Sequence, residues 1–171
     1  MKEIEFLETQ KIKSKIIYLI LIVIDLCLLY VCFLQIIKKS TIGTNPISNT
    51  GLIILTSIMI LSTIFCFFIK LKTIINSNGI YFKYEPIHLK YKFYSWEYIN
   101  NIYLKKFSPL LDYGGWGIRI KYRIWKRKEI AYFLKGNIGI FCEIKNGKKI
   151  LIGTQEPENV NEILKKLNKI L

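Results

Sequence analysis

The chain has 171 residues, a mean hydropathy of +0.28 and a formal net charge of +14, although 51% of its residues are hydrophobic. Apolar and charged residues are separated along the chain, since 20 of the 26 basic residues and 8 of the 12 acidic residues follow residue 69. This pattern excludes a wholly soluble globular protein, a disordered chain and a secreted disulfide scaffold.

Two apolar runs predict two transmembrane helices, at 16–37 and at 51–70. The first run is interrupted only by Asp25 and Gln35, and the second, over residues 52–69, only by threonine and serine hydroxyls. A hydrocarbon core of roughly 30 Å needs about 20 helical residues, so both runs are long enough to cross it. The first run is too long for a signal peptide, and acidic residues precede it.

The two helices are predicted to form a hairpin with both chain termini in the cytoplasm. The external loop 38–50 contains Gly43, Asn45 and Pro46, which are turn residues. Lysines are more frequent in the cytoplasmic N-terminal segment 1–15 and just after the second helix than in this loop. The positive-inside rule therefore puts the loop outside.

Asp25 is the one ionisable residue inside the first apolar run. A charge near the middle of a bilayer costs at least ~2.5–3.5 kcal/mol, so the carboxyl group should face a polar neighbour. Three interpretations stay open: a protonated carboxyl bonded to the hydroxyl of Thr56 or Ser57, a docking contact with a partner membrane protein, and a transport role.

The segment 74–171 is predicted to be a separate cytoplasmic domain of the α+β class. Apolar and polar residues alternate, and turn residues recur every eight to twelve positions, which is typical of a small antiparallel sheet domain. An amphipathic helix follows from Glu158 to about Leu171. We expect a seven-stranded, pleckstrin-homology-like β-barrel capped by this helix, with strands at 79–85, 88–94, 99–107, 118–125, 130–134, 138–144 and 149–153.

Four segments of this domain resemble the bacterial pleckstrin-homology-like membrane proteins. They are Trp96-Glu97-Tyr98-Ile99, Asp112-Tyr113-Gly114-Gly115-Trp116-Gly117-Ile118-Arg119, Gly136-Asn137-Ile138-Gly139, and the run from Asn146 to Pro157. The resemblance implies a multi-pass protein of the bacterial cytoplasmic (inner) membrane, and it transfers no catalytic residue.

Glycines and tryptophans of these segments are expected to form a structural motif. Glycine permits a positive φ or a close backbone approach, and we expect Trp116 to pack inward beside it. The motif consists of Trp96, Gly114, Gly115, Trp116 and Gly117.

The clearest functional signal is electrostatic. Arg119, Lys121 and Arg123 alternate with Ile118, Ile120, Tyr122 and Ile124, so three cations should share one strand face while the apolar residues face the core. Anionic lipid headgroups attract such cations, and a neighbouring tryptophan suits a bilayer interface. The predicted lipid-binding residues are Arg119, Lys121, Arg123, Trp125, Lys126, Arg127 and Lys128. A solvated strand face and an acidic protein partner are the alternatives.

No pattern of catalytic or metal-binding residues is visible. His88 is the only histidine, and the four cysteines form no Cys-x-x-Cys pair. We therefore expect no enzyme activity, no cofactor, no metal and no nucleic-acid binding. The sequence predicts a non-enzymatic integral membrane protein that contacts anionic lipids. The alternative is a scaffold subunit, or a homo-oligomer, that docks another membrane protein through the hairpin, with Asp25, and the barrel.

Overall fold

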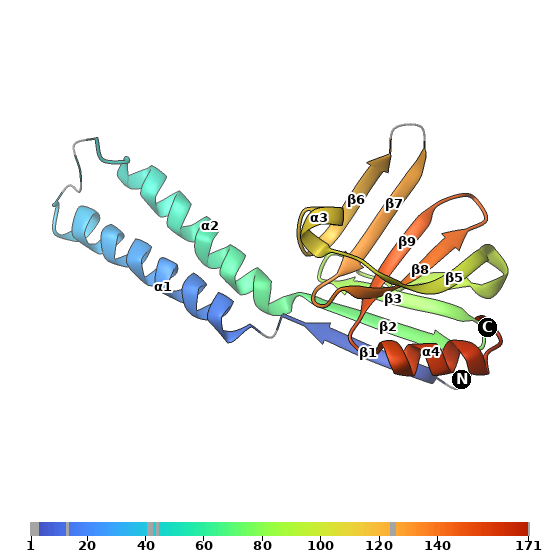
Figure 1. The fold of residues 1–171 in the computed structure, drawn as a ribbon. Helices are drawn as coiled ribbons and strands as arrows, with labels where there is room; N and C mark the ends of the chain where they lie inside the picture. Colours follow the sequence, from blue (N-terminus) through green and yellow to red (C-terminus); the bar gives the residue numbers. More distant parts are fainter. Residues whose placement is uncertain (1–3, 13, 41–42, 44, 124–125, 171) are drawn as a thin grey trace. The chain divides into compact units, whose positions relative to one another are not determined.

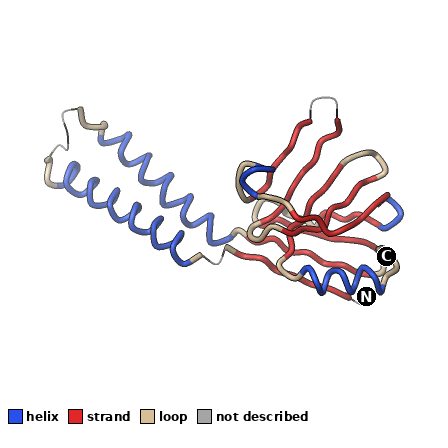
Figure 2. Tube along the Cα trace, viewed as in Figure 1, coloured by secondary structure: helices blue, strands red, loops and turns tan. Residues whose placement is uncertain are grey.

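The computed structural model describes residues 4–12, 14–40, 43, 45–123 and 126–170, without the side chains of residues 4 and 122–128. The chain divides into two compact units, which are described separately. One is helical and extends from Lys13 to Phe68, and the other joins the segment before it, up to Ile12, with everything from Ile69 onward. Figure 2 shows that the second unit contains all the strands.

The helical unit is an antiparallel pair, α1 (Lys15–Cys32) and α2 (Asn49–Phe68), with a short π-helical segment at Phe33–Ile37 after α1 (Figure 1). Side chains of the two helices meet near both ends of the pair. The rings of Tyr18 and Phe67 stack with centroids 4.4 Å apart, and Cys32 Sγ lies 3.2 Å from Thr56 Oγ1. Both helical stretches are long and apolar enough to cross a membrane.

The second unit contains two sheets. In the first, four antiparallel strands lie in the order β1-β2-β3-β4, and in the second, five strands lie in the order β5-β8-β9-β7-β6, where only β7 and β9 are parallel. Short helices η2 and α3 flank β5, and α4 closes the chain. The bounds are β1 Ile4–Lys11, β2 Lys70–Asn76, β3 Gly79–Glu85, β4 Lys92–Ser95, η2 Trp96–Tyr98, β5 Ile99–Lys106, α3 Pro109–Tyr113, β6 Gly117–Arg123, β7 Lys126–Phe133, β8 Ile138–Ile144, β9 Lys149–Thr154 and α4 Pro157–Lys166.

The core of this unit is contributed by both sheets and by one face of α4. Phe82 of the first sheet and Ile140 of the second are fully buried in one cluster. Val160 and Leu164 of α4, four residues apart and therefore on one helix face, are also fully buried in it. The predicted C-terminal amphipathic helix is thus confirmed, although it begins at Pro157 and ends at Lys166.

The described chain has nine strands in two sheets that do not close into a barrel, whereas a seven-stranded barrel was expected. The strands predicted at 79–85 and 138–144 have those bounds. The strand predicted at 88–94 begins only at Lys92, because the chain turns after β3 where the amide of His88 donates to Tyr84 O at 2.8 Å.

The domain also includes one strand outside the predicted range 74–171 and one that begins before it. β1 lies in the expected N-terminal segment 1–15, and β2 begins at Lys70, directly after α2. β1 pairs with β2 with Lys11 opposite Lys70, so the segments that precede and follow the helical unit share one sheet. The chain leaves this sheet after Lys11 and returns to it at Lys70.

A buried polar network fixes β1 to the end of β9. The carboxylate of Glu8 accepts hydrogen bonds from Thr154 Oγ1 at 2.7 Å and from the amide of Gln155 at 2.8 Å. Gln10 Nε2 donates to Glu8 Oε1 and to Gly153 O, at 3.0 and 2.6 Å. Burial raises the pKa of Glu8 above its usual value, although these hydrogen bonds oppose the rise.

Candidate functional site

The glycine-rich segment begins with the short helix α3, which is stabilised at both ends. Ser108 Oγ accepts from the amide of Leu111 at 3.3 Å, and Gly114 ends the helix in the left-handed conformation with φ 69°. Tyr113 packs on Phe107 and Phe133, with ring centroids 5.6 and 5.4 Å away. The helix therefore turns Tyr113 inward and leaves apolar side chains exposed, namely Leu110 at 62% and Leu111 at 91%.

The glycines that follow adopt the positive φ that the sequence predicts. Gly115 has φ 121° and Gly117 has φ 109°, a region that other residues rarely adopt. Arg119 Nε donates to Gly115 O at 3.1 Å and so helps to hold this turn. Trp116 is 48% exposed, so the prediction that it packs inward is wrong. The inward aromatic side chain of this segment is instead Tyr113, which packs on Phe107 and Phe133.

Lys121 lies next to the same short helix. Its Nζ atom is 3.9 Å from Asp112 Oδ1 and 5.4 Å from the centroid of the Tyr113 ring. The Tyr113 hydroxyl donates to Glu129 Oε1, and burial together with this carboxylate raises the pKa of Tyr113. Arg119 and Lys121, two of the predicted lipid-binding cations, are therefore brought together with the glycine turn and α3.

The strand β6 only partly follows the predicted alternation. Ile118 packs against the core, but Ile120 is 48% exposed, so the prediction that both face the core is wrong for Ile120. β7 pairs with β9 only over Glu129–Tyr132. Beyond Glu129, toward the turn between β6 and β7, the described residues of these two strands pair only with each other. Figure 1 shows that this end of the hairpin projects from the sheet.

Most of the predicted lipid-binding residues belong to this projecting hairpin. Arg123 and Lys126 are paired in the backbone ladder, and Arg127 and Lys128 follow in β7. Trp125 lies outside the described residues, and the side chains of Arg123, Lys126, Arg127 and Lys128 do as well.

Trp96 has a structural role. Its indole Nε1 donates to Asn76 O at 3.0 Å, and its ring packs against the core. Lys169 Nζ lies 5.4 Å from the ring centroid. Trp96 thus connects β2, the start of η2 and the chain after α4.

Asp25 lies within the helical pair and is 9% exposed. Its Oδ1 atom has no hydrogen-bond partner among the described residues. One of the three open interpretations, a bond between this oxygen and Thr56 or Ser57, is therefore not seen, and the Thr56 hydroxyl donates to Leu52 O at 2.9 Å. The burial of Asp25 shows that it faces α2 rather than outward.

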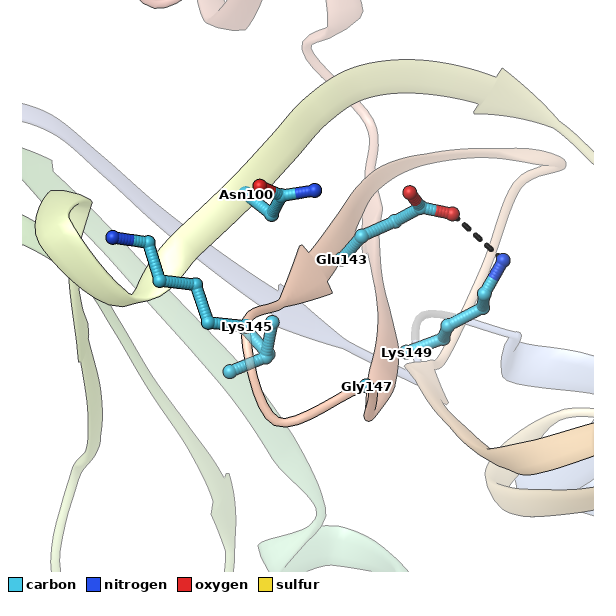
Figure 3. Close-up of a pocket in the computed structure, with 6 residues that line it drawn as sticks. Asn100, Glu143, Lys145, Gly147 and Lys149 are labelled. Carbon is cyan, nitrogen blue, oxygen red and sulfur yellow. Dashed lines mark hydrogen bonds and ion pairs between the residues drawn. The ribbon is translucent and has the colours of Figure 1, made fainter.

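A cavity of about 340 Å³ lies at the turn between β8 and β9 (Figure 3). Glu143 and Lys149 point toward one another across it, with Nζ 2.7 Å from Oε1, and this hydrogen bond raises the pKa of Lys149. The charges of Glu143 and Lys149 therefore neutralise each other at this edge of the cavity. Within the described ranges, no group of three or more His, Cys, Asp or Glu residues could hold a metal ion.

The sequence interpretation missed the exposed leucines of α3. The signal was present, because a Ser-Pro helix start and a glycine stop enclose Leu110 and Leu111 on a helix too short to bury both. Chemically, α3 and the adjacent start of β6 combine exposed apolar side chains with cations. Neither a known protein family nor a curated protein sequence matches the chain.

Proposed function

We propose that this is a non-enzymatic integral membrane protein that presents a divergent pleckstrin-homology-like domain to the cytoplasmic leaflet of a bacterial inner membrane. In this proposal α1 and α2 span the bilayer, and both termini are cytoplasmic. The corner formed by α3, the glycine turn and the β6–β7 hairpin contacts anionic lipid headgroups.

The pairing of Lys11 with Lys70 is the observation that carries the proposal. Three residues separate Lys11 from α1, and only Ile69 separates α2 from Lys70. α1 therefore starts, and α2 ends, beside adjacent strands of one sheet. A segment whose two ends lie on the same side of a bilayer must cross it an even number of times. The pairing therefore supports a hairpin whose two ends emerge on the same side, next to the domain.

One end of this corner, the glycine turn with the start of β6, belongs to the part of the domain near this junction. Lys70 pairs with Glu85 of β3. Beside Glu85, the hydroxyl oxygen of Tyr84 would lie 3.7 Å from a Cβ atom placed on Gly117. The glycine turn and the start of β6 are therefore close to the strand that receives the chain from α2.

The charges of this corner suit an anionic leaflet. Each Lys or Arg near such a surface contributes about 1 kcal/mol, and the attraction fades within a Debye length of about 8–10 Å. The exposed side chains of Leu111 and Trp116 add an apolar component that a purely solvated strand face would not need. This combination favours lipid contact over an acidic protein partner.

The full-length chain, reconstituted in vesicles, tests the proposal. Energy transfer from a fluorophore on Ile120→Cys, in a chain whose Cys27, Cys32 and Cys66 are replaced by alanine, to a labelled anionic lipid would measure lipid enrichment around the domain. We expect enrichment that falls steeply as salt rises. It should be lost in the quadruple serine variant of Arg123, Lys126, Arg127 and Lys128.

The matched control replaces four lysines elsewhere on the domain by serine and removes the same total charge. Suitable positions are Lys145, Lys148, Lys165 and Lys169 of the β8–β9 turn and the C-terminal region. Equal loss of enrichment in both quadruple variants would show that only net charge matters, and would contradict a specific lipid-contacting corner.

A further inference from the structure

The loop between β3 and β4, residues 86–91, exposes apolar side chains at alternating positions. Ile87 is 56% exposed, Leu89 is 88% exposed and Tyr91 is 41% exposed. Lys90 lies among them and is also exposed. None of these side chains contributes to the buried core, although a loop of this length could have been built from polar residues.

The intervening His88 holds this loop against the domain. Its backbone amide donates to Tyr84 O at 2.8 Å, and its Nδ1 atom accepts from the amide of Tyr84 at 3.1 Å. The imidazole ring packs on Phe82 and Tyr132, with centroids 6.2 and 5.4 Å away. Lys92, just beyond the loop, donates to the hydroxyl of Tyr132 at 3.0 Å. The loop is therefore fixed in a conformation that turns Ile87 and Leu89 outward.

Covalent connectivity limits how far this loop can lie from the end of α2. Phe68 and Lys70 are two residues apart, a Cα distance of at most ~7.6 Å. Lys70 and Glu85 are opposite each other in adjacent strands, where Cα atoms are roughly 4.5–5.5 Å apart. Glu85, the residue before the loop, therefore lies within ~13 Å of Phe68 for any orientation of the domain relative to the helices.

We infer that loop 86–91 inserts Ile87 and Leu89 into the bilayer interface beside the membrane-spanning helices. This inference rests on the proposed membrane anchoring, but it adds an apolar contact distinct from the basic corner. An interface about 13 Å or less from the start of the loop is within reach of these side chains. Lys90 and Tyr91 have the amphipathic character that is common at the headgroup level. We favour the bilayer, rather than a protein, as the surface that covers this loop, because the short connection to the proposed membrane-spanning helices keeps the loop next to the bilayer at all times.

The test uses single-cysteine variants of the full chain in vesicles of neutral lipid, labelled with an environment-sensitive fluorophore. Cys27, Cys32 and Cys66 are replaced by alanine. Cys142 can remain, because complete burial raises the pKa of its thiol to about 12 and keeps it unreactive. For the label on Leu89→Cys, fluorescence quenching is measured first with iodide, which stays in the water, and then with spin-labelled lipid.

Tyr98→Cys is the matched control, because Tyr98 is 64% exposed and follows Ser95, which pairs with Gly79 at the opposite end of β3. A chain that retains only Cys27, which is exposed on α1, and the buried Cys142 reports on the span itself. We expect several-fold weaker iodide quenching and several-fold stronger lipid quenching at position 89 than at position 98. The difference should persist at high salt, because the contact is apolar.

The outcomes separate this inference from the proposed function. If the label on Cys27 is quenched by lipid but the label at position 89 responds only to iodide, the loop inference is overturned and the anchoring stands. If the label at position 89 is shielded from both quenchers, a protein rather than lipid covers the loop, and the inference is again overturned. If the label on Cys27 is not quenched by lipid, the anchoring itself fails, and the inference fails with it.

Discussion

Replacing Thr154 by valine should release β1 from the end of β9. The substitution keeps the shape of the side chain but removes the 2.7 Å hydrogen bond to the buried carboxylate of Glu8. It also leaves the amide of Glu156 without its 3.1 Å bond to the same hydroxyl. A hydrogen bond to a charged group contributes about 1.5–3 kcal/mol, so we expect the free energy of unfolding to fall by about 2–3 kcal/mol.

Urea unfolding of the full-length protein in nonionic detergent, followed by tryptophan fluorescence, measures this loss, because Trp96 packs against the core. Thr9→Val is the matched control. Thr9 lies on the exposed face of β1, next to Glu8, so the free energy of unfolding should change by no more than about 0.5 kcal/mol. A Thr154→Val protein as stable as the control would refute the idea that this network holds β1.

The pH dependence of Glu8 gives a second measurement on the same network. The pKa of Glu8 is higher in the folded state than its ordinary value of 4.5, so the folded state retains a proton that the unfolded state loses. Between 4.5 and the raised pKa, the unfolding free energy therefore rises as pH falls. Glu8→Gln lacks this dependence, and the wild type should gain stability relative to this variant on acidification.

Three further changes test other parts of the structure. Gly79→Ala should cost about 3 kcal/mol, because the new Cβ atom would lie 2.2 Å from the carbonyl oxygen of Tyr94; thermal unfolding within 1 °C of the wild type would contradict this. Burial lowers the pKa of His88 below 6.5, so the unfolded state binds a proton first, and the free energy of unfolding should fall as pH drops through 6.5. The His88→Gln variant should not show this fall, and the same dependence of unfolding free energy on pH in both proteins would exclude the effect. Asp25→Leu should make membrane insertion of the 16–37 segment more favourable by about 3 kcal/mol in a glycosylation assay, and unchanged insertion would contradict a membrane-embedded carboxyl group. Loss of a stoichiometric partner in the same variant would instead favour the scaffold alternative.

Local patterns were sufficient for much of the fold. The two apolar runs, the strand at 79–85 and the amphipathic face of α4 follow directly from periodicity. β1 was missed because its inward positions carry Glu8 and Gln10, which hide the alternation of a buried strand. These polar residues are buried only because partners more than a hundred residues away satisfy them, which no local pattern can indicate.

β2 and the arrangement of the strands in two sheets that do not close into a barrel were not predicted, for a different reason. The alternation of Leu71, Thr73 and Ile75 begins directly after an apolar helix, so the domain was predicted to begin only at residue 74 and its first strand only at residue 79. The parallel pairing of β7 with β9 depends on contacts between strands that are distant in sequence, and alternation alone does not indicate strand order. Alternation places Arg119 and Lys121 on one strand face, but it does not indicate that Arg119 binds the glycine turn or that Lys121 lies next to Asp112 of α3.

The pairing of β1 with β2 has a consequence for biosynthesis. β1 is made before the first apolar helix, yet it has no partner strand until the second helix has been completed and β2 has followed. A chain in which only one helix crossed the bilayer would leave these strands on opposite sides, with Phe6 and Leu71 uncovered. In the proposed topology, the domain can mature only after both helices have been inserted, and its folding would verify the topology of each newly made chain.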